Sequence, residues 1–181
     1  NMSGVVGRPL QLALVSGTTF TSSIDGTTYT FRTRDTYYAR DNGTGLYNFL
    51  TTEGSNEIPI FEGIEKTKTF FVGEKDERQI YIIPDETIDT STSIVRVYET
   101  ASSTDFITYT PLSLAIDVNQ NSTHFQVVES PNGTYELNFG DGVTFGKTPE
   151  AGIRIVVTYS RTIGETANGC KAFTTSAAFT I

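Results

Sequence analysis

HFQVVESPNGTYELNF, residues 124–139, predicts a β-hairpin more plainly than any other stretch of the chain. Two runs of alternating residues flank the turn sequence Ser130-Pro131-Asn132-Gly133, and Asn-Gly is a strong hairpin signal. Because successive side chains of a strand point to opposite faces, one face of this hairpin should be buried and the other solvated. The expected buried face holds Phe125, Val127, Tyr135, Leu137 and Phe139, and the expected outer face holds His124, Gln126, Glu136 and Asn138.

Similar strand signals recur on both sides of this hairpin. Residues 17–31 hold two runs of threonine and aromatic residues around Asp25-Gly26, which predicts a second hairpin. Residues 5–15 are apolar but contain Gly7 and Pro9, so we expect a broken or edge strand there. Further strands are expected at residues 68–72, 79–83, 94–99 and 153–159.

Three segments interrupt these strands. Residues 32–48 are polar and of mixed charge, and they predict either a surface loop or a short irregular crossing. Residues 73–78 are mostly charged and predict a turn. Thr110-Pro111 could begin one short helical turn that ends at Ile116, since Thr suits the N-cap and Pro the first helical position.

The composition places the whole chain in the mainly β class. Val, Ile, Thr, Tyr and Phe together number 78, against 18 residues of Leu, Ala and Met. β-Branched and aromatic side chains suit a pleated, half-buried surface and are disfavoured in helices. We therefore expect antiparallel sheets with hairpins, arranged as a sandwich or an open barrel, with little helix.

The charge balance limits the possible partners. Thirteen basic and 21 acidic residues give a net charge of −8, and a nucleic-acid or anionic membrane partner would demand a basic surface. No apolar run reaches the length of a membrane span, and no signal peptide is visible. A single Cys excludes a disulfide within the chain, and one Cys with one His excludes a zinc site built mainly from those ligands.

The length of 181 residues suits one domain or two small ones. We expect β-rich subdomains at residues 1–75 and 76–181, the second of which contains the hairpin at 125–139. Because the chain opens with Asn1-Met2, we also expect it to be an excerpt from a longer protein.

No motif for catalysis or cofactor binding emerges. Residues 140–148 resemble a phosphate-binding loop, but Asp141 stands where that pattern needs Gly, and Pro149 and Gly152 lead into a strand rather than a helix. Calcium is disfavoured because Asp141 has no acidic neighbour two or four residues on. His124 is expected at the surface, and the chain has no nucleophile motif of the G-x-S-x-G type whose serine His124 could activate as a general base. We therefore expect no enzyme, no metal and no cofactor.

A collinear set of short motifs runs through nearly the whole chain. It includes Asp25-Gly26 within the second hairpin and Gly140-Asp141-Gly142 after the first. The complete set lies at residues 17–31, 58–63, 83–84, 89–92, 108–110, 125–129, 132–142, 146–147, 152, 156–159, 164 and 167–169. In this order the motifs resemble the ring-forming wedge subunit of contractile-tailed phage baseplates, of the T-even type and related to baseplate J-like proteins.

The resemblance implies a structural protein of the virion. Copies of such subunits pair within each wedge of the tail baseplate, and the wedges join into a ring around the central hub that rearranges when the sheath contracts. The implied partners are other wedge subunits, including copies of the chain itself, and assembly takes place in the host cytoplasm. The implied protein has no catalytic residues.

Charge density in the loops suggests which residues contact partner subunits. The hypothesis places these contacts on a mixed-charge stretch at residues 32–41 and an acidic loop at residues 85–89, although plain solvated loops explain both equally well. The residues concerned are Arg32, Arg34, Asp35, Arg40, Asp85, Glu86 and Asp89.

A receptor- or glycan-binding domain of a tail fibre or adhesin is the competing interpretation. Such a domain shares the acidic, threonine- and glycine-rich β composition. Sugar sites usually stack an aromatic ring on the sugar, and the chain has no Trp, which counts against this alternative. Tyr37 and Tyr38 remain available for such stacking.

Overall fold

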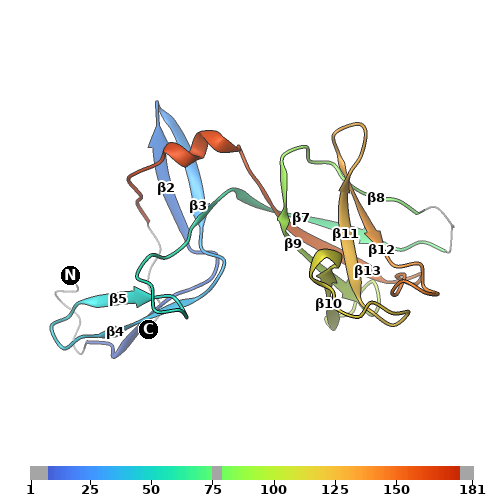
Figure 1. The fold of residues 1–181 in the computed structure, drawn as a ribbon, viewed down its shortest axis with the longest axis horizontal. Coiled ribbons are helices and arrows are strands. Elements are labelled where there is room, and N and C mark those ends of the chain that lie inside the picture. The colour runs from blue at the N-terminus through green and yellow to red at the C-terminus, as the bar shows by residue number, and fades with distance from the viewer. Residues whose placement is uncertain (1–7, 75–78, 176–181) are drawn as a thin grey trace. The chain divides into compact units, whose positions relative to one another are not determined.

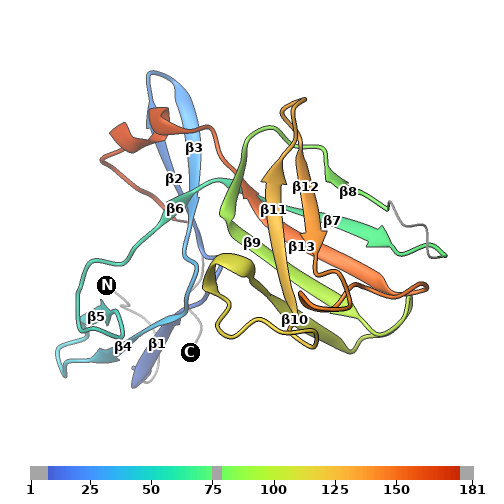
Figure 2. The same ribbon diagram turned by 45° about the vertical axis from the view of Figure 1, so that its right-hand side comes forward.

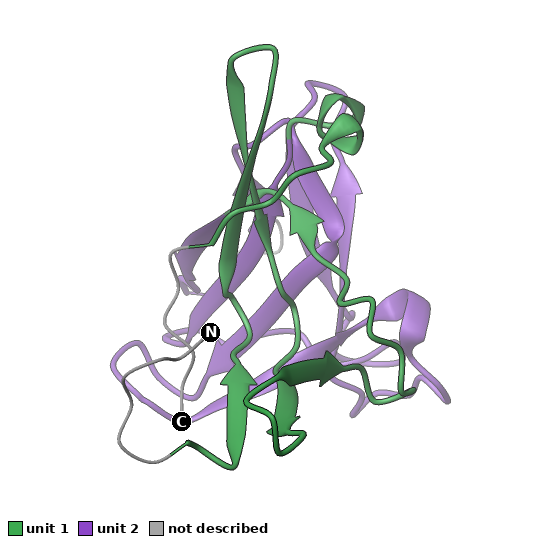
Figure 3. Cartoon of the chain, turned by 90° about the vertical axis from the view of Figure 1, so that its left-hand side faces the viewer, with its two compact units in different colours: residues 1–64, 163–181 green, residues 65–162 purple. Residues whose placement is uncertain are grey.

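The computed structural model describes residues 8–74 and 79–175. These residues form a mainly β structure, as the composition predicts, with antiparallel pairing in most of its sheets. The chain divides into two compact units, one of residues 1–64 with 163–181 and the other of residues 65–162 (Figure 3). The predicted charged turn at 73–78 and the N-terminal part of the expected strand at 5–15 fall partly outside the described residues.

The boundary between the units differs from the one expected after residue 75. β7 (Ile64–Phe71) belongs to the sheet of the second unit, where it neighbours β13 (Arg154–Arg161). After β13 the chain returns to the first unit, where the Ile163 N–H donates to the Glu62 carboxylate at 3.0 Å. Pairing between segments distant in sequence sets this division, and composition along the chain does not report it.

The second unit is built around one seven-stranded sheet, which curls into a nearly closed barrel (Figures 1 and 2). Its strands follow one another in the order β7-β13-β9-β10-β11-β12-β8. Besides β7 and β13 they are β8 (Tyr81–Ile83), β9 (Ile88–Tyr98), β10 (Phe106–Pro111), β11 (His124–Glu129) and β12 (Tyr135–Phe139). β10 and β11 pair in parallel, and the 3-10 helix η1 (Leu112–Leu114) lies in the connection between them, where the short helical turn was expected.

Alternating apolar side chains fill the interior of this barrel-like sheet. Ile83, Val95, Leu137, Ile155 and Val157 are its most deeply buried members. The β11–β12 hairpin pairs Phe125 with Phe139 and Val127 with Leu137, so residues of the predicted inner face lie opposite one another. At its turn the Gly133 N–H donates to the Ser130 carbonyl and the Asn132 side chain accepts from Thr134. The buried face predicted from the sequence is therefore confirmed.

The first unit contains two three-stranded sheets. One has the order β2-β3-β6, with strands β2 (Thr19–Ile24), β3 (Thr27–Arg32) and β6 (Phe61–Glu62). The predicted hairpin is confirmed: Ile24 pairs with Thr27 across Asp25-Gly26, and both turn residues have positive φ, as a two-residue hairpin turn requires. Tyr29, Phe31 and Ala167 form the small core of this sheet, and Ala167 comes from the 3-10 helix η2 (Glu165–Gly169).

The other sheet of the first unit corrects the prediction for residues 32–48. Its order is β1-β4-β5, with strands β1 (Gln11–Leu14), β4 (Tyr37–Asp41) and β5 (Tyr47–Leu50). β1 is an edge strand, as expected. β4 and β5 form a hairpin rather than a loop, because Tyr37 and Ala39 alternate as buried residues and the Asp41 carboxylate accepts from the Gly43 and Gly45 amides. Charged residues on the solvated face conceal this alternation.

Replacement of Leu137 by Ala tests the core. Leu137 is only 1% exposed, so the truncation should leave a cavity and lower the free energy of unfolding by about 3 kcal/mol. Urea unfolding followed by circular dichroism measures this loss. Ile82→Ala is the matched control, because Ile82 is 44% exposed on the neighbouring strand and its truncation should cost less than about 1 kcal/mol. Equal losses for the two variants would contradict the described interior.

Candidate functional site

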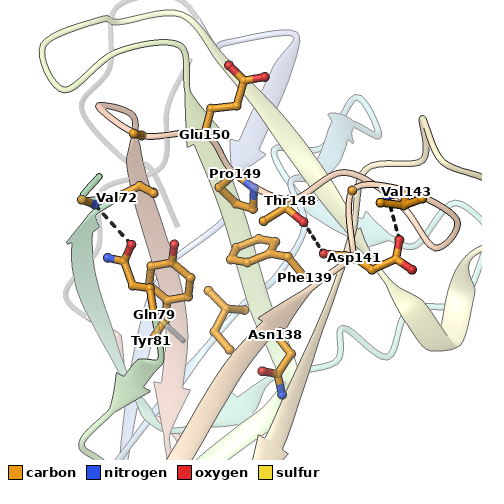
Figure 4. Close-up of a pocket in the computed structure, with 15 residues that line it drawn as sticks. Val72, Gln79, Tyr81, Asn138, Phe139, Asp141, Val143, Thr148, Pro149 and Glu150 are labelled. Atoms are coloured by element: carbon orange, nitrogen blue, oxygen red, sulfur yellow. Dashed lines mark hydrogen bonds between the residues drawn. The ribbon is translucent and has the colours of Figure 1, made fainter. Parts of the chain in front are cut away.

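A cavity of about 790 Å³ opens at one mouth of the barrel-like sheet (Figure 4). Gln79 and Tyr81 line one side, and Phe139 and Pro149 line the other. β7 and β8 are the two edge strands of the sheet. Beside the cavity the Gln79 side chain joins these edges, because its amide donates to the Phe71 carbonyl at 3.0 Å and accepts from the Gly73 N–H at 3.2 Å. Both bonds lie in the connection that leads from β7 to β8, beside the ends of the two strands.

Aromatic rings line the cavity. The rings of Tyr81 and Phe139 meet edge to face with centroids 5.7 Å apart, and Phe139 packs in the same way on Tyr109. The Tyr81 hydroxyl is protonated at neutral pH, as that of an ordinary Tyr is, and can donate a hydrogen bond; burial raises its pKa further. No described residue that lines the cavity is basic. The cavity therefore suits a neutral ligand with apolar and hydroxyl groups better than an anion.

The loop at residues 140–148 forms the rim of this cavity and carries the motif that resembled a phosphate-binding loop. One carboxylate oxygen of Asp141 accepts from the amides of Val143, Thr144 and Phe145 at 2.7–2.9 Å. These bonds lower the pKa of Asp141. The backbone amides of this loop, which could otherwise bind an anion, are therefore already bonded to the Asp141 carboxylate. This agrees with the sequence argument against nucleotide binding.

His124 is buried, and its predicted surface position is wrong. Strand alternation does place it on the opposite face from Phe125, but the 140–148 loop covers that position and leaves His124 only 4% exposed. The His124 and Phe145 rings meet edge to face at 6.1 Å, and the Lys147 N–H donates to the Ser122 carbonyl at 2.9 Å. The His124 Nδ1 atom has no hydrogen-bond partner among the described residues. A loop distant in sequence buries this imidazole.

A second candidate site lies on the outer face of the same sheet. Arg154 stacks on the Tyr98 ring at 4.0 Å, and Arg96 lies over the Phe106 ring at 5.3 Å. The two rings are themselves 5.3 Å apart. Strand register produces this arrangement, because Tyr98 pairs with Phe106 on one side and with Arg154 on the other. We call Arg96, Tyr98, Phe106 and Arg154 the arginine–aromatic cluster.

The cluster is preorganised for contact with another molecule. Phe106 is 46% exposed, and the Arg154 guanidinium is held by a 2.8 Å hydrogen bond to the Ser103 carbonyl as well as by its ring contact. Neither Arg96 nor Arg154 forms a salt bridge within the described part of the chain. One guanidinium held by the backbone and a second one over the Phe106 ring, beside exposed aromatic surface, can bind a carboxylate together with apolar side chains.

The residues predicted to contact partners lie in different compact units. In the first unit Arg34 stacks on the Phe61 ring at 3.6 Å, and Asp35 and Arg40 are exposed. Arg32 is half-buried, and its Nε atom has no hydrogen-bond partner among the described residues. Their assignment to an interface stays a prediction.

The predicted acidic loop belongs to the second unit. Asp85 pairs with Arg161 at 3.5 Å, and Asp89 accepts hydrogen bonds from Ser91. Glu86 is exposed. The Asp85 and Asp89 side chains thus organise local structure. Their role in contact with a partner stays a prediction, as does that of the charged residues at 32–41.

Three further observations bear on alternative functions. Of the two tyrosines proposed for sugar stacking, Tyr37 is buried and only Tyr38 is exposed. Within residues 8–74 and 79–175, no three His, Cys, Asp or Glu side chains gather as a possible metal site. No helix in these ranges is long and apolar enough to cross a membrane.

No protein-family model matches the chain. No curated protein matches it either. Of the two candidate sites, the cavity was not predictable because it depends on how β7, β12 and the 140–148 loop meet. The arginine–aromatic cluster left a partial signal, since Arg96 and Tyr98 occupy alternate positions of a predicted strand, but their partners are set by register.

Replacement of Gly146 by Ala tests the packing of the loop on His124. Gly146 has φ +84°, and a β-carbon there would overlap the His124 ring and lie 2.9 Å from the Ser122 carbonyl. The variant should lose about 3 kcal/mol of unfolding free energy in urea titrations. Gly152→Ala is the control, because Gly152 has the same φ but open space around it, and it should lose only about 1 kcal/mol. Similar losses would show that strain in φ alone accounts for the effect.

Asp141 should titrate below its ordinary value in the folded chain. Its charged form accepts three backbone amides, so the stabilisation is present above the unfolded pKa and is lost as the pH falls through the lower folded pKa. An NMR titration of the side-chain carboxyl measures this directly. In Asp141→Ala the amides of Val143, Thr144 and Phe145 should exchange faster with solvent. An Asp141 pKa at or above the ordinary value would refute the bonded loop.

Proposed function

We propose that the chain is a structural component of a contractile-tail baseplate wedge, which contributes to assembly of the ring around the hub and to its rearrangement on sheath contraction. The observation that supports an assembly role best is the arginine–aromatic cluster on the outer face of the sheet. Tyr, Phe and Arg are enriched in protein interfaces, and anchors held in place before binding lose little entropy.

The collinear motifs narrow this role to the baseplate. Several of them coincide with turns on which the fold depends: Asp25-Gly26 connects β2 and β3, and Asn132-Gly133 lies between β11 and β12. Gly140-Asp141-Gly142 opens the loop that buries His124. The motifs that carry the resemblance therefore have structural roles here, which supports a common scaffold.

Glycan binding by a tail-fibre or adhesin domain is the second candidate, and the cavity favours it. Tyr81 and Phe139 offer apolar ring surface, and the Tyr81 hydroxyl makes no hydrogen bond within the described residues. A sugar combines apolar C–H faces with hydroxyl groups, which matches this lining. Against it, the Gln79 amide already binds the backbone on both sides.

Immunogold electron microscopy of purified phage particles distinguishes the two candidates. An antibody raised against the chain should label the body of the distal plate of the tail if the chain is a wedge component. Label at the fibre tips would instead favour the glycan-binding candidate. Particles disrupted with mild denaturant serve as the control for a hidden epitope, and absence of label from both intact and disrupted particles would contradict both candidates.

A further inference from the structure

We propose that copies of this chain bind one another head to tail, through the arginine–aromatic cluster of one copy and an acidic row on the next copy. The inference rests on the proposed structural role and names the surfaces that perform it. Both surfaces lie on the outer face of the seven-stranded sheet, at different strands. The contact is therefore between unlike patches, and such contacts build rings or filaments.

The acidic row consists of Ile82, Glu136 and Val128, which lie side by side across β8, β12 and β11. Glu136 pairs with Ile82 on one side and with Val128 on the other. Their strand neighbours Tyr81, Ile83 and Leu137 are buried, so the three side chains point outward. Ile82 is 44% and Val128 39% exposed, and Glu136 between them is half-buried. A carboxylate thus stands between two exposed apolar side chains.

The two surfaces are complementary in charge and in apolar character. The cluster presents two guanidinium groups beside the exposed Phe106 ring, and the row presents one carboxylate flanked by Ile82 and Val128. Glu136 forms no salt bridge within the described residues, as is also true of Arg96 and Arg154. Docking of the row on the cluster would pair these charges and cover both apolar surfaces.

The registers show why the two surfaces are distinct. The cluster occupies β9, β10 and β13, whereas the row occupies β8, β11 and β12 of the same sheet. When the cluster of one copy binds the row of another, the resulting dimer still has an unoccupied row at one end and an unoccupied cluster at the other. Association should therefore continue beyond the dimer as concentration rises.

Sedimentation velocity of the full chain tests this inference. The wild-type chain should form oligomers as its concentration rises toward about 1 mM, and more so at about 0.05 M than at about 0.5 M salt. Arg96→Glu and Glu136→Arg should each raise the apparent dissociation constant about tenfold or more. An equimolar mixture of the two variants should associate again, because each restores a charge pair with the other.

Matched variants separate the surfaces from net charge. Lys66→Glu and Glu129→Arg change the charge by the same amounts, and both residues are exposed and belong to neither surface. Glu129 follows Val128 in β11 and, by strand alternation, faces the opposite side of the sheet. These controls should associate like the wild type, and circular dichroism spectra should match for all variants. A chain that stays monomeric to about 1 mM, oligomers that survive both reversals, or a mixture that fails to associate would each overturn the inference.

The outcomes also separate this inference from the proposed function. A chain that labels the baseplate body but stays monomeric refutes the head-to-tail contact alone. A chain that associates through the two surfaces but is absent from the baseplate refutes the wedge role alone.

Discussion

The burial of one apolar face by the sheet itself is the interaction on which the second unit depends. A sheet with one apolar face must cover it, and the short 3-10 helices of the described residues offer little surface for this. The seven strands therefore curve until Val95, Val157 and Leu137 pack against one another in the interior. The curvature also produces the cavity at one mouth, where edge strands β7 and β8 come together, and it turns the alternate side chains of each strand outward.

Sequence reasoning succeeded where the determinants are local. The alternation in residues 124–139 predicted one hairpin with its inner face, and the Asp25-Gly26 turn predicted the other hairpin. It failed where a distant segment intervenes. His124 lies on the predicted face, but the 140–148 loop covers it. The β4–β5 hairpin was missed because its charged face hides Tyr37 and Ala39, and the unit boundary was missed because β13 pairs with strands far away in sequence.

The candidate sites show the same contrast between features set by local sequence and features set by distant segments. The acidic residues of the 85–89 loop are visible in the sequence, and Asp85 organises local structure because it accepts a hydrogen bond from the Thr87 N–H, whereas its ion pair with the distant Arg161 is not visible there. The arginine–aromatic cluster draws its members from three strands, and only the register brings Arg154 onto Tyr98. Side chains gathered by register rather than by spacing are the ones that sequence patterns overlook.

The Gln79 bridge between β7 and β8 has a mechanical consequence. Within the described residues every other neighbouring pair of strands in the seven-stranded sheet is joined along the backbone, whereas these two edges meet through the Gln79 side-chain amide and the edge-to-face contact of Phe70 with Tyr81. Strain across the barrel at this junction is therefore carried by side chains rather than by a strand ladder within the described residues. The barrel thus contains one junction that depends on side-chain contacts, whereas its other neighbouring strands are held by backbone pairing.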